Sequence, residues 1–221
     1  MIIQPGTSIY CAHGGKGTVG ALVRKSARSR KLYLLTAWHV LDNDRASGAT
    51  EVRLGSARGK VIATYKPGNA TRDEKLDVAI AELDKDIEDL EWTNKVRGSN
   101  KLLNKTASPT SRTKFQMYGA TTKLSNCRLD QKFQAFGSIE NAFLLKAAEG
   151  VDASTGFCAS GDSGAMWYSQ NSGRMIGLHS KGDMSGEVNG TMRTNCAAAV
   201  SITAIMNKLQ IELATEVEAV T

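Results

Sequence analysis

Short apolar segments alternate with turn-forming residues along most of this chain, and this pattern restricts the possible fold more than any other feature. Three examples are GTVGALVRK at residues 17–25, KLYLLTAWHVL at 31–41 and LDVAIAEL at 76–83. Gly, Ser, Asn and charged clusters separate these segments. Short runs of this kind, bounded by such residues, are typical of β-strands. We therefore expect an all-β protein.

The apolar segments fall into two sets, which predicts two β lobes. The second set includes KFQMYGATT, NAFLLKAAEG, RMIGLHSKG and CAAAVSI. A polar stretch that holds one of the three prolines lies between the two sets. We predict an N-terminal β-barrel over residues 1–92, a connection over 93–112 and a C-terminal β-barrel over 113–221.

The segment at residues 202–214 has a different period. Its apolar side chains recur at steps of three and four, which marks one face of a helix; they are Ile202, Ile205, Met206, Leu209 and Leu213. We predict that the second lobe ends in an α-helix over residues 202–214.

Composition agrees with an ordinary globular protein. The chain has 221 residues, of which 41% are hydrophobic and 23% charged, enough to bury a substantial core. No run approaches the roughly 20 apolar residues of a membrane span. The N-terminal residues show no secretory signal pattern, so we expect either an intracellular protein or an excised mature domain.

The net charge of +6 weakly favours acidic partners. The densest basic cluster, RKSARSRK at residues 24–31, lies between two apolar runs. We interpret it as the solvated tip of a hairpin. Contact with RNA or with an acidic surface is the alternative interpretation.

The four cysteines are Cys11, Cys127, Cys158 and Cys196. They are few and scattered, with no C-x-x-C pair and no histidine at ligand spacing, so neither a disulfide scaffold nor a zinc site is predicted. We expect free buried thiols. A bridge between Cys158 and Cys196 is the alternative.

The stretch STGFCASGDSGAMWY at residues 154–168 holds the candidate nucleophile, Ser163. Gly-Asp-Ser-Gly can be an ordinary turn, but glycines also let backbone N–H groups approach a reacting carbonyl. A nucleophilic serine needs a histidine base, which a carboxylate orients. Among three histidines, His39 closes the run YLLTAWHVL and is expected at a strand end; Asp77 opens an apolar strand.

These residues carry a family resemblance. TAWHV resembles the Thr-Ala-Ala-His segment of the chymotrypsin-like serine proteases, LDVAIAEL their Asp-containing strand, and SGDSGAMW their Gly-Asp-Ser-Gly-Gly-Pro. The closing AVSITAIMNKLQ is similar to their C-terminal helix. The order His39, Asp77, Ser163 is that of the family. The resemblance implies two six-stranded antiparallel β-barrels with a C-terminal α-helix.

The resemblance also implies a role for each residue of the site. His39 would be the general base and then the general acid, Asp77 would fix its tautomer, and Ser163 would form the acyl-enzyme. The N–H groups of Gly161 and Ser163 would form the oxyanion hole. In the family, the aspartate that matches Asp162 also pairs with an N-terminal amine freed by zymogen cleavage. We do not expect that role here, because the N-terminal sequence shows no activation peptide.

The segment GLHSKG at residues 177–182 resembles the S1-wall strand of glutamyl endopeptidases and of RNA-virus proteases. By that resemblance, His179 would hydrogen-bond Glu or Gln at P1, with Ser180, Phe157 and Lys181 as further S1 residues. The alternative interpretation is a strand histidine whose ring is turned to solvent or satisfied by backbone. Phe157 stands where a trypsin-like pocket would have an acid, so cleavage after basic residues is not expected.

We therefore expect a serine endopeptidase that cleaves after Glu or Gln, with a polypeptide substrate and no metal or organic cofactor. Processing of a viral polyprotein, its own included, in the host cytoplasm is the favoured setting. A bacterial trypsin-like or glutamyl endopeptidase is the alternative. A protease-fold module that binds nucleic acid or protein is disfavoured by the intact triad. An α/β-hydrolase is rejected because its triad order is reversed.

Overall fold

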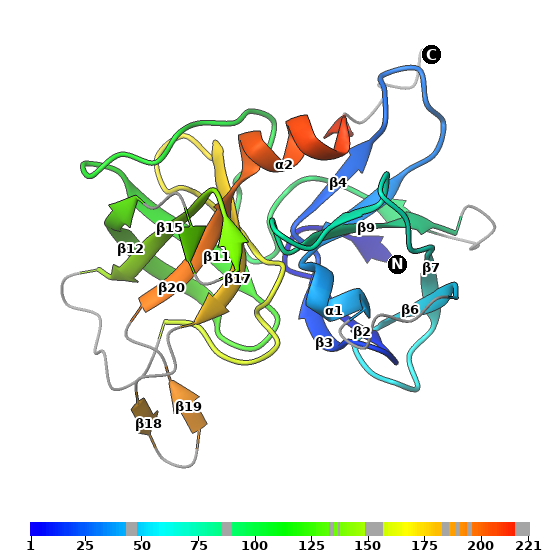
Figure 1. Cartoon of the computed structure of the whole chain (residues 1–221), viewed down its shortest axis with the longest axis horizontal. Helices are drawn as coiled ribbons and strands as arrows, with labels where there is room; N and C mark the ends of the chain where they lie inside the picture. The colour runs from blue at the N-terminus through cyan, green and yellow to red at the C-terminus, as the bar shows by residue number, and fades with distance from the viewer. Residues whose placement is uncertain are drawn as a thin grey trace.

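The computed structural model describes residues 1–42, 48–84, 90–132, 135–136, 138–148, 157–182, 186–188, 191–193 and 196–214. Two β lobes lie side by side, and a helix runs along one end of the pair (Figure 1). The predicted all-β architecture with two lobes and a C-terminal helix is confirmed.

The first lobe is a nine-stranded sheet. From one edge to the other its order is β21-β4-β5-β9-β7-β6-β2-β3, and β8 pairs with β9. It is thus a curved sheet with two edges, while the second lobe forms a closed barrel. Its strands are β2 (Ser8–Cys11), β3 (Gly15–Thr18), β4 (Ala21–Arg24), β5 (Tyr33–Thr36), β6 (Thr50–Leu54), β7 (Val61–Tyr65), β8 (Arg72–Asp73), β9 (Val78–Leu83) and β21 (Glu212–Leu213).

The second lobe closes in the order β11-β12-β15-β20-β17-β16. All of its neighbouring strands run antiparallel. Its strands are β11 (Lys114–Gly119), β12 (Lys123–Lys132), β15 (Ala142–Ala147), β16 (Met166–Ser169), β17 (Met175–Gly182) and β20 (Cys196–Ser201). Closure pairs the edge strands, which leaves no open edge among these six strands.

Three two-stranded ribbons complete the described strands. They pair β1 (Ile2–Ile3) with β10 (Glu91–Trp92), β13 (Ala135–Phe136) with β14 (Ile139–Glu140), and β18 (Gly186–Val188) with β19 (Thr191–Arg193). The first ribbon is parallel. The basic cluster at residues 24–31 connects β4 to β5, which pair antiparallel, as the hairpin prediction requires.

The C-terminal helix is shorter than predicted. Helix α2 spans Ile202–Leu209 and buries Ile202, Ile205 and Leu209. It ends because Gln210 adopts a left-handed backbone, with φ of 51°. The chain beyond it is extended instead of helical, and β21 pairs with β4 of the first lobe.

A shared apolar cluster joins the two lobes. Leu35 and Ile80 of the first lobe lie in the same buried cluster as Met166, Leu178 and Val200 of the second. This shared core fixes how the facing loops of the two lobes meet.

The cysteines contribute to the buried parts of both lobes. Cys11 and Cys127 are free and buried, and Cys158 lies in the core cluster of the second lobe with Cys127. The side chain of Cys196 is outside the described part of the structure, so a bridge to Cys158 stays untested. Among the described residues, no helix has the length and apolar character needed to span a bilayer.

Candidate active site

His39 lies in a short helix and not at the end of a strand as predicted. Strand β5 ends at Thr36, and α1 (Trp38–Asp42) follows. The turn forms because the N–H of Trp38 donates to the carbonyl of Asp77 at 3.1 Å and that of Val40 to the carbonyl of Ala37 at 3.2 Å. The helix therefore starts against the segment that carries Asp77.

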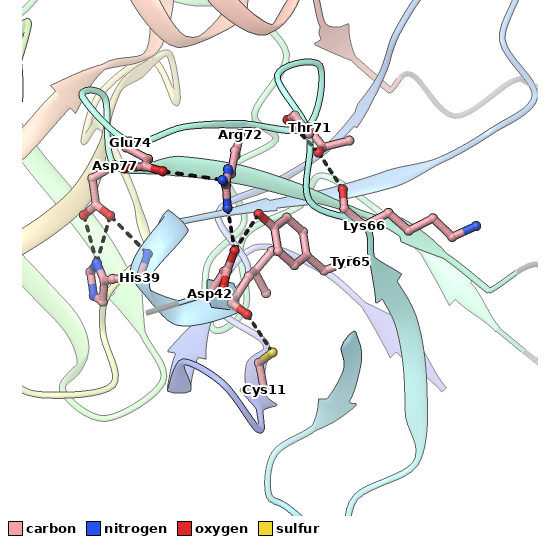
Figure 2. A network of polar contacts seen from close by, with 11 residues as sticks. Cys11, His39, Asp42, Tyr65, Lys66, Thr71, Arg72, Glu74 and Asp77 are labelled. Carbon is pink, nitrogen blue, oxygen red and sulfur yellow. Dashed lines mark hydrogen bonds and ion pairs between the residues drawn. The ribbon is translucent and has the colours of Figure 1, made fainter. Parts of the chain in front are cut away.

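Asp77 holds the ring of His39 with both carboxylate oxygens (Figure 2). The Nδ1 of His39 lies 3.0 Å from Oδ1 and 2.9 Å from Oδ2, and its backbone N–H donates to Oδ1 at 3.2 Å. The side chain of Asp77 is only 5% exposed, and that of His39 is 28% exposed. This contact favours the proton on Nδ1 and leaves Nε2 as the basic nitrogen.

The position of Asp77 is fixed by its backbone and by Ser180. Asp77 has φ of 45°, a left-handed conformation that aspartate tolerates better than most residues. The hydroxyl of the buried Ser180 donates to Oδ2 of Asp77. Ser180 is one of the predicted S1 residues, and its hydroxyl also orients the carboxylate that holds His39.

A second buried carboxylate anchors the helix of His39. Asp42, at the end of α1, is fully buried and accepts a hydrogen bond from Arg72 Nη1 at 2.6 Å (Figure 2). The Tyr65 hydroxyl donates to the same oxygen at 3.4 Å. The Arg72 guanidinium also lies 5.8 Å from the centre of the Trp38 ring. These contacts tie α1 to β8, which pairs with β9, the strand that follows Asp77.

Ser163 lies in the loop before β16 and is bound to the first lobe. Its carbonyl accepts from the N–H of Thr18 in β3 at 2.9 Å. The next residue, Gly164, has φ of +88°, and a Cβ there would lie 2.0 Å from Thr36 Oγ1 and 2.9 Å from the nitrogen of Ala37. Ser163 is thus held at the junction of the lobes, beside the segment that leads into the helix of His39.

The two candidate oxyanion donors have no acceptor within the described structure. Neither the N–H of Gly161 nor that of Ser163 donates a hydrogen bond to any described residue. Gly161 has φ of +96°, a conformation that favours glycine. Two unused N–H groups in one turn, beside a serine, can accept an oxyanion.

His179 is a buried, neutral histidine on the strand next to Ser163. Its backbone N–H donates to Ala165 at 2.8 Å, and its carbonyl accepts from Gly164 at 2.8 Å. Its ring packs edge-on against Trp167, with ring centres 6.1 Å apart. Burial lowers the pKa of His179 from 6.5 to about 4, against the opposing influence of Asp162. Its Nδ1 is buried with no partner among the described residues.

The other two predicted S1 residues lie in different surroundings. Phe157 is buried in the core of the second lobe, with its ring centre 6.1 Å from that of Trp167. Phe157 therefore contacts the same Trp167 ring that packs against His179. Lys181 follows Ser180 in β17 and is exposed. Of the predicted S1 residues, Ser180 contacts Asp77 directly, and the charges of His39 and Asp77 act on the ring of His179.

Sequence reasoning missed the threonines that contact the Ser163 loop. The hydroxyl of Thr18 donates to the carbonyl of Gly161 at 2.8 Å, and that of Thr121 to the carbonyl of Ser160 at 2.8 Å. Only the tertiary structure reveals these contacts, because Thr18 and Thr121 lie in segments that carry no catalytic motif.

Comparison with known proteins identifies the fold. No protein-family model matches the chain, and no curated protein matches it. Several solved structures do match it. A glutamic acid-specific serine protease that uses a histidine triad in substrate binding has a TM-score of 0.69 at 17% identity, covering 96% of this chain and all of that one.

Two further similar structures are proteases from named organisms. Nocardiopsis protease has a TM-score of 0.67 at 18% identity, covering 97% of this chain and all of its own. Thermobifida fusca protease A has a TM-score of 0.63 at 18% identity, covering 98% of this chain and all of its own. At these identities the likeness establishes the fold. The predicted chymotrypsin-like fold is confirmed.

Proposed function

We propose that this chain is a serine endopeptidase whose triad is His39, Asp77 and Ser163. The observation that carries the proposal is the contact of both Asp77 carboxylate oxygens with Nδ1 of His39, at 3.0 and 2.9 Å. An ordinary surface histidine is solvated by water. It does not require a buried aspartate beside it, and here that aspartate, Asp77, also has a left-handed backbone. A hydrogen bond from Nδ1 to a buried carboxylate, which leaves Nε2 free to accept a proton, is what a general base for a serine hydroxyl requires.

The proposed reaction proceeds through an acyl-enzyme. Nε2 of His39 takes the proton of the Ser163 hydroxyl as Oγ bonds to the scissile carbonyl carbon. The resulting oxyanion accepts from the N–H groups of Gly161 and Ser163. When the C–N bond breaks, His39 gives its proton to the leaving amine. Water then attacks the ester, with His39 again as base, and releases the acid product and the free serine.

We further propose that the enzyme cleaves after Glu or Gln and that His179 recognises the P1 side chain. A neutral imidazole can donate a ring N–H to a carboxylate or an amide oxygen, so His179 alone does not choose between the two. A buried polar group that bonds its substrate rejects analogues lacking that bond. The similarity to a glutamic acid-specific protease supports this specificity.

The pocket differs from that protein's in one respect. The glutamic acid-specific protease uses a histidine triad in substrate binding. This chain also has three histidines, but two of them have other surroundings. His39 contacts Asp77, and His13 is exposed. His179 would therefore act as a single histidine backed by Trp167.

Two broader expectations stay proposals. The proposed setting is processing of a viral polyprotein in the host cytoplasm, with a bacterial trypsin-like or glutamyl endopeptidase as the alternative. The alternative of a module that binds nucleic acid rests on the net charge of +6. The ordered contacts around His39, Asp77 and Ser163 favour the enzyme.

The first test is digestion of a mixed peptide library, with cut sites identified by mass spectrometry. The wild-type chain should cut after Glu or Gln. Ser163→Ala should lower the rate by about 10⁴-fold or more, because it removes the nucleophile. Ser172→Ala, which alters an exposed turn serine of the same lobe, is the matched control and should keep full activity.

The His179→Ala variant tests the pocket in the same library. Its cuts after Glu and Gln should decrease relative to cuts after other residues. Wild-type cuts after unrelated residues would overturn the S1 assignment and retain the triad. A folded wild-type chain that cuts nothing would overturn the proposed enzyme.

A further inference from the structure

The turn between β11 and β12 binds the carboxylate of Asp162, the residue before Ser163. Oδ1 of Asp162 accepts from the N–H groups of Thr121 at 2.8 Å and Thr122 at 3.0 Å. Oδ2 accepts from the N–H of Ala159 at 2.9 Å and from the Thr122 hydroxyl. A carboxylate offers about four acceptor positions, so these four donors occupy it. A Cβ on Gly119 would lie 2.2 Å from Oδ1, so a glycine is needed there.

Thr121 also controls the peptide bond between Ser160 and Gly161. Its hydroxyl donates to the Ser160 carbonyl at 2.8 Å and accepts from Lys16 Nζ at 3.3 Å. In a trans peptide the N–H points opposite to the C=O. Because Thr121 holds the carbonyl of Ser160, the N–H of Gly161 is directed away from Thr121. The reverse orientation would remove this donor from the oxyanion hole.

The second donor is oriented in the same manner by backbone. The carbonyl of Asp162 accepts from the N–H of Ala165 at 2.9 Å, which directs the N–H of Ser163 to the opposite side. Thr18 ties the loop to the turn, since its hydroxyl donates to the Gly161 carbonyl at 2.8 Å and accepts from the N–H of Ala120 at 3.0 Å.

We propose that Thr121 is a positioning residue of the oxyanion hole. Its hydroxyl holds the Ser160 carbonyl and so aims the N–H of Gly161 at the substrate oxyanion. The inference rests on the proposed endopeptidase function. It also follows that threonine hydroxyls and backbone groups of this chain hold the oxyanion hole. The carboxylate of Asp162 already accepts four hydrogen bonds, so it has no free acceptor position for an N-terminal amine.

Thr121 suits a clean test because it is exposed. Thr121→Val removes the hydroxyl and would place a methyl group near 2.8 Å from the Ser160 oxygen, which repels it. We expect kcat on a peptide substrate to fall about 10- to 100-fold with KM little changed, since an oxyanion donor acts mainly in the transition state. Thr121→Ser keeps the hydroxyl and should restore most of kcat.

The matched control is Thr110→Val, which removes a hydroxyl from another exposed residue, in the connection between the lobes, bonded only to Thr113 among the described contacts. It should have wild-type kcat and KM. Thermal unfolding of all variants should be similar, so that the loss of rate is separable from loss of fold.

A ligand pair reports on the hole itself. A peptide trifluoromethyl ketone accepts Ser163 Oγ at its carbonyl carbon and becomes an oxyanion, while the corresponding peptide alcohol stays neutral. Thr121→Val should lose about tenfold or more in affinity for the ketone, the scale expected for a misaligned oxyanion donor. Its affinity for the alcohol should be unchanged.

The outcomes separate this inference from the proposed function. If wild type turns over substrate and Thr121→Val has the same kcat and ketone affinity, the positioning role is wrong. A rise in KM alone, or equal loss of both ligands, also overturns it. A wild-type chain that neither cleaves peptides nor binds the ketone removes the proposed function, and this inference with it.

Discussion

The buried imidazole of His179 makes stability depend on pH. In the unfolded chain it has its ordinary pKa of 6.5, and burial in the folded protein lowers this pKa to about 4. Between these values the unfolded chain binds more protons than the folded protein. The free energy of unfolding therefore decreases as pH falls from about 6.5 towards 4, by up to about 1.4 kcal/mol per pH unit.

Urea denaturation at several pH values measures this effect. His179→Gln cannot take up the proton, so it should lose less stability than wild type between pH 7 and pH 4.5. Asp162, His39 and Asp77, the charged groups that act on the ring, are the same in both proteins. Parallel stability curves for the two would contradict the buried, neutral state of His179.

At this scale the sequence predicts residue types better than contacts. Short motifs predict the proposed triad of His39, Asp77 and Ser163, because nucleophile chemistry needs those residue types in a recognisable local setting. The same reasoning did not predict that the Ser180 hydroxyl contacts Asp77. That contact joins residues 103 positions apart, and Thr121 is likewise distant from the loop it holds. Such pairings depend on strand register, which no local motif encodes.

Among the elements, α1 depends on the ion pair between Arg72 and Asp42. Asp42 is fully buried, and Arg72 is 24% exposed in its side chain. Arg72→Ala would leave the buried carboxylate without this cation and should lower the free energy of unfolding by about 3 kcal/mol. Because α1 carries His39, kcat should decrease as well. Chemical denaturation and peptide hydrolysis measure the two effects.

The control for this element is Arg53→Ala. Arg53 pairs with the exposed Glu51, and exposed pairs contribute under about 1 kcal/mol. Equal and small losses in Arg53→Ala and Arg72→Ala would show that the Asp42 contact does not anchor α1.

The sequence predicts helices and strands well where the apolar residues recur with a clear period. It predicts them less well where contacts with distant residues decide where a helix begins or ends. The strand segments and the C-terminal helix follow from apolar spacing. Helix α1 was read as strand because its five residues are too few to show a period, and because its first N–H bonds the distant Asp77. Helix α2 stops at Leu209 because the following residues pack on the first lobe.

For the whole molecule, residues 211–214 connect the end of the second lobe back to the first. Asn94 donates from Nδ2 to the carbonyls of Leu22 at 3.0 Å and Ala214 at 2.8 Å, and its Oδ1 accepts from the N–H of Leu22 at 2.8 Å. Ile211 and Ala214 are buried. One buried amide therefore joins the connection between lobes, strand β4 and the chain after α2.

Truncation tests this connection. A chain that ends at Gln210 loses β21, the Ala214 contacts and the buried Ile211, and should be about 3 kcal/mol less stable than wild type. A chain that ends at Glu216 keeps them all and should match wild type. Differential scanning calorimetry measures both, and equal midpoints of unfolding would contradict the structural role of residues 211–214.

The return of β21 to β4 also orders events during synthesis. Its partner strand β4 precedes it in the chain, and the edge beside β4 stays open until residue 213 has been made. Ser163, whose carbonyl binds the N–H of Thr18 in the first lobe, is synthesised only fifty residues before residue 213. A nascent chain therefore cannot complete the proposed active site before the second lobe has been made, and its outermost strand pairs only after that lobe.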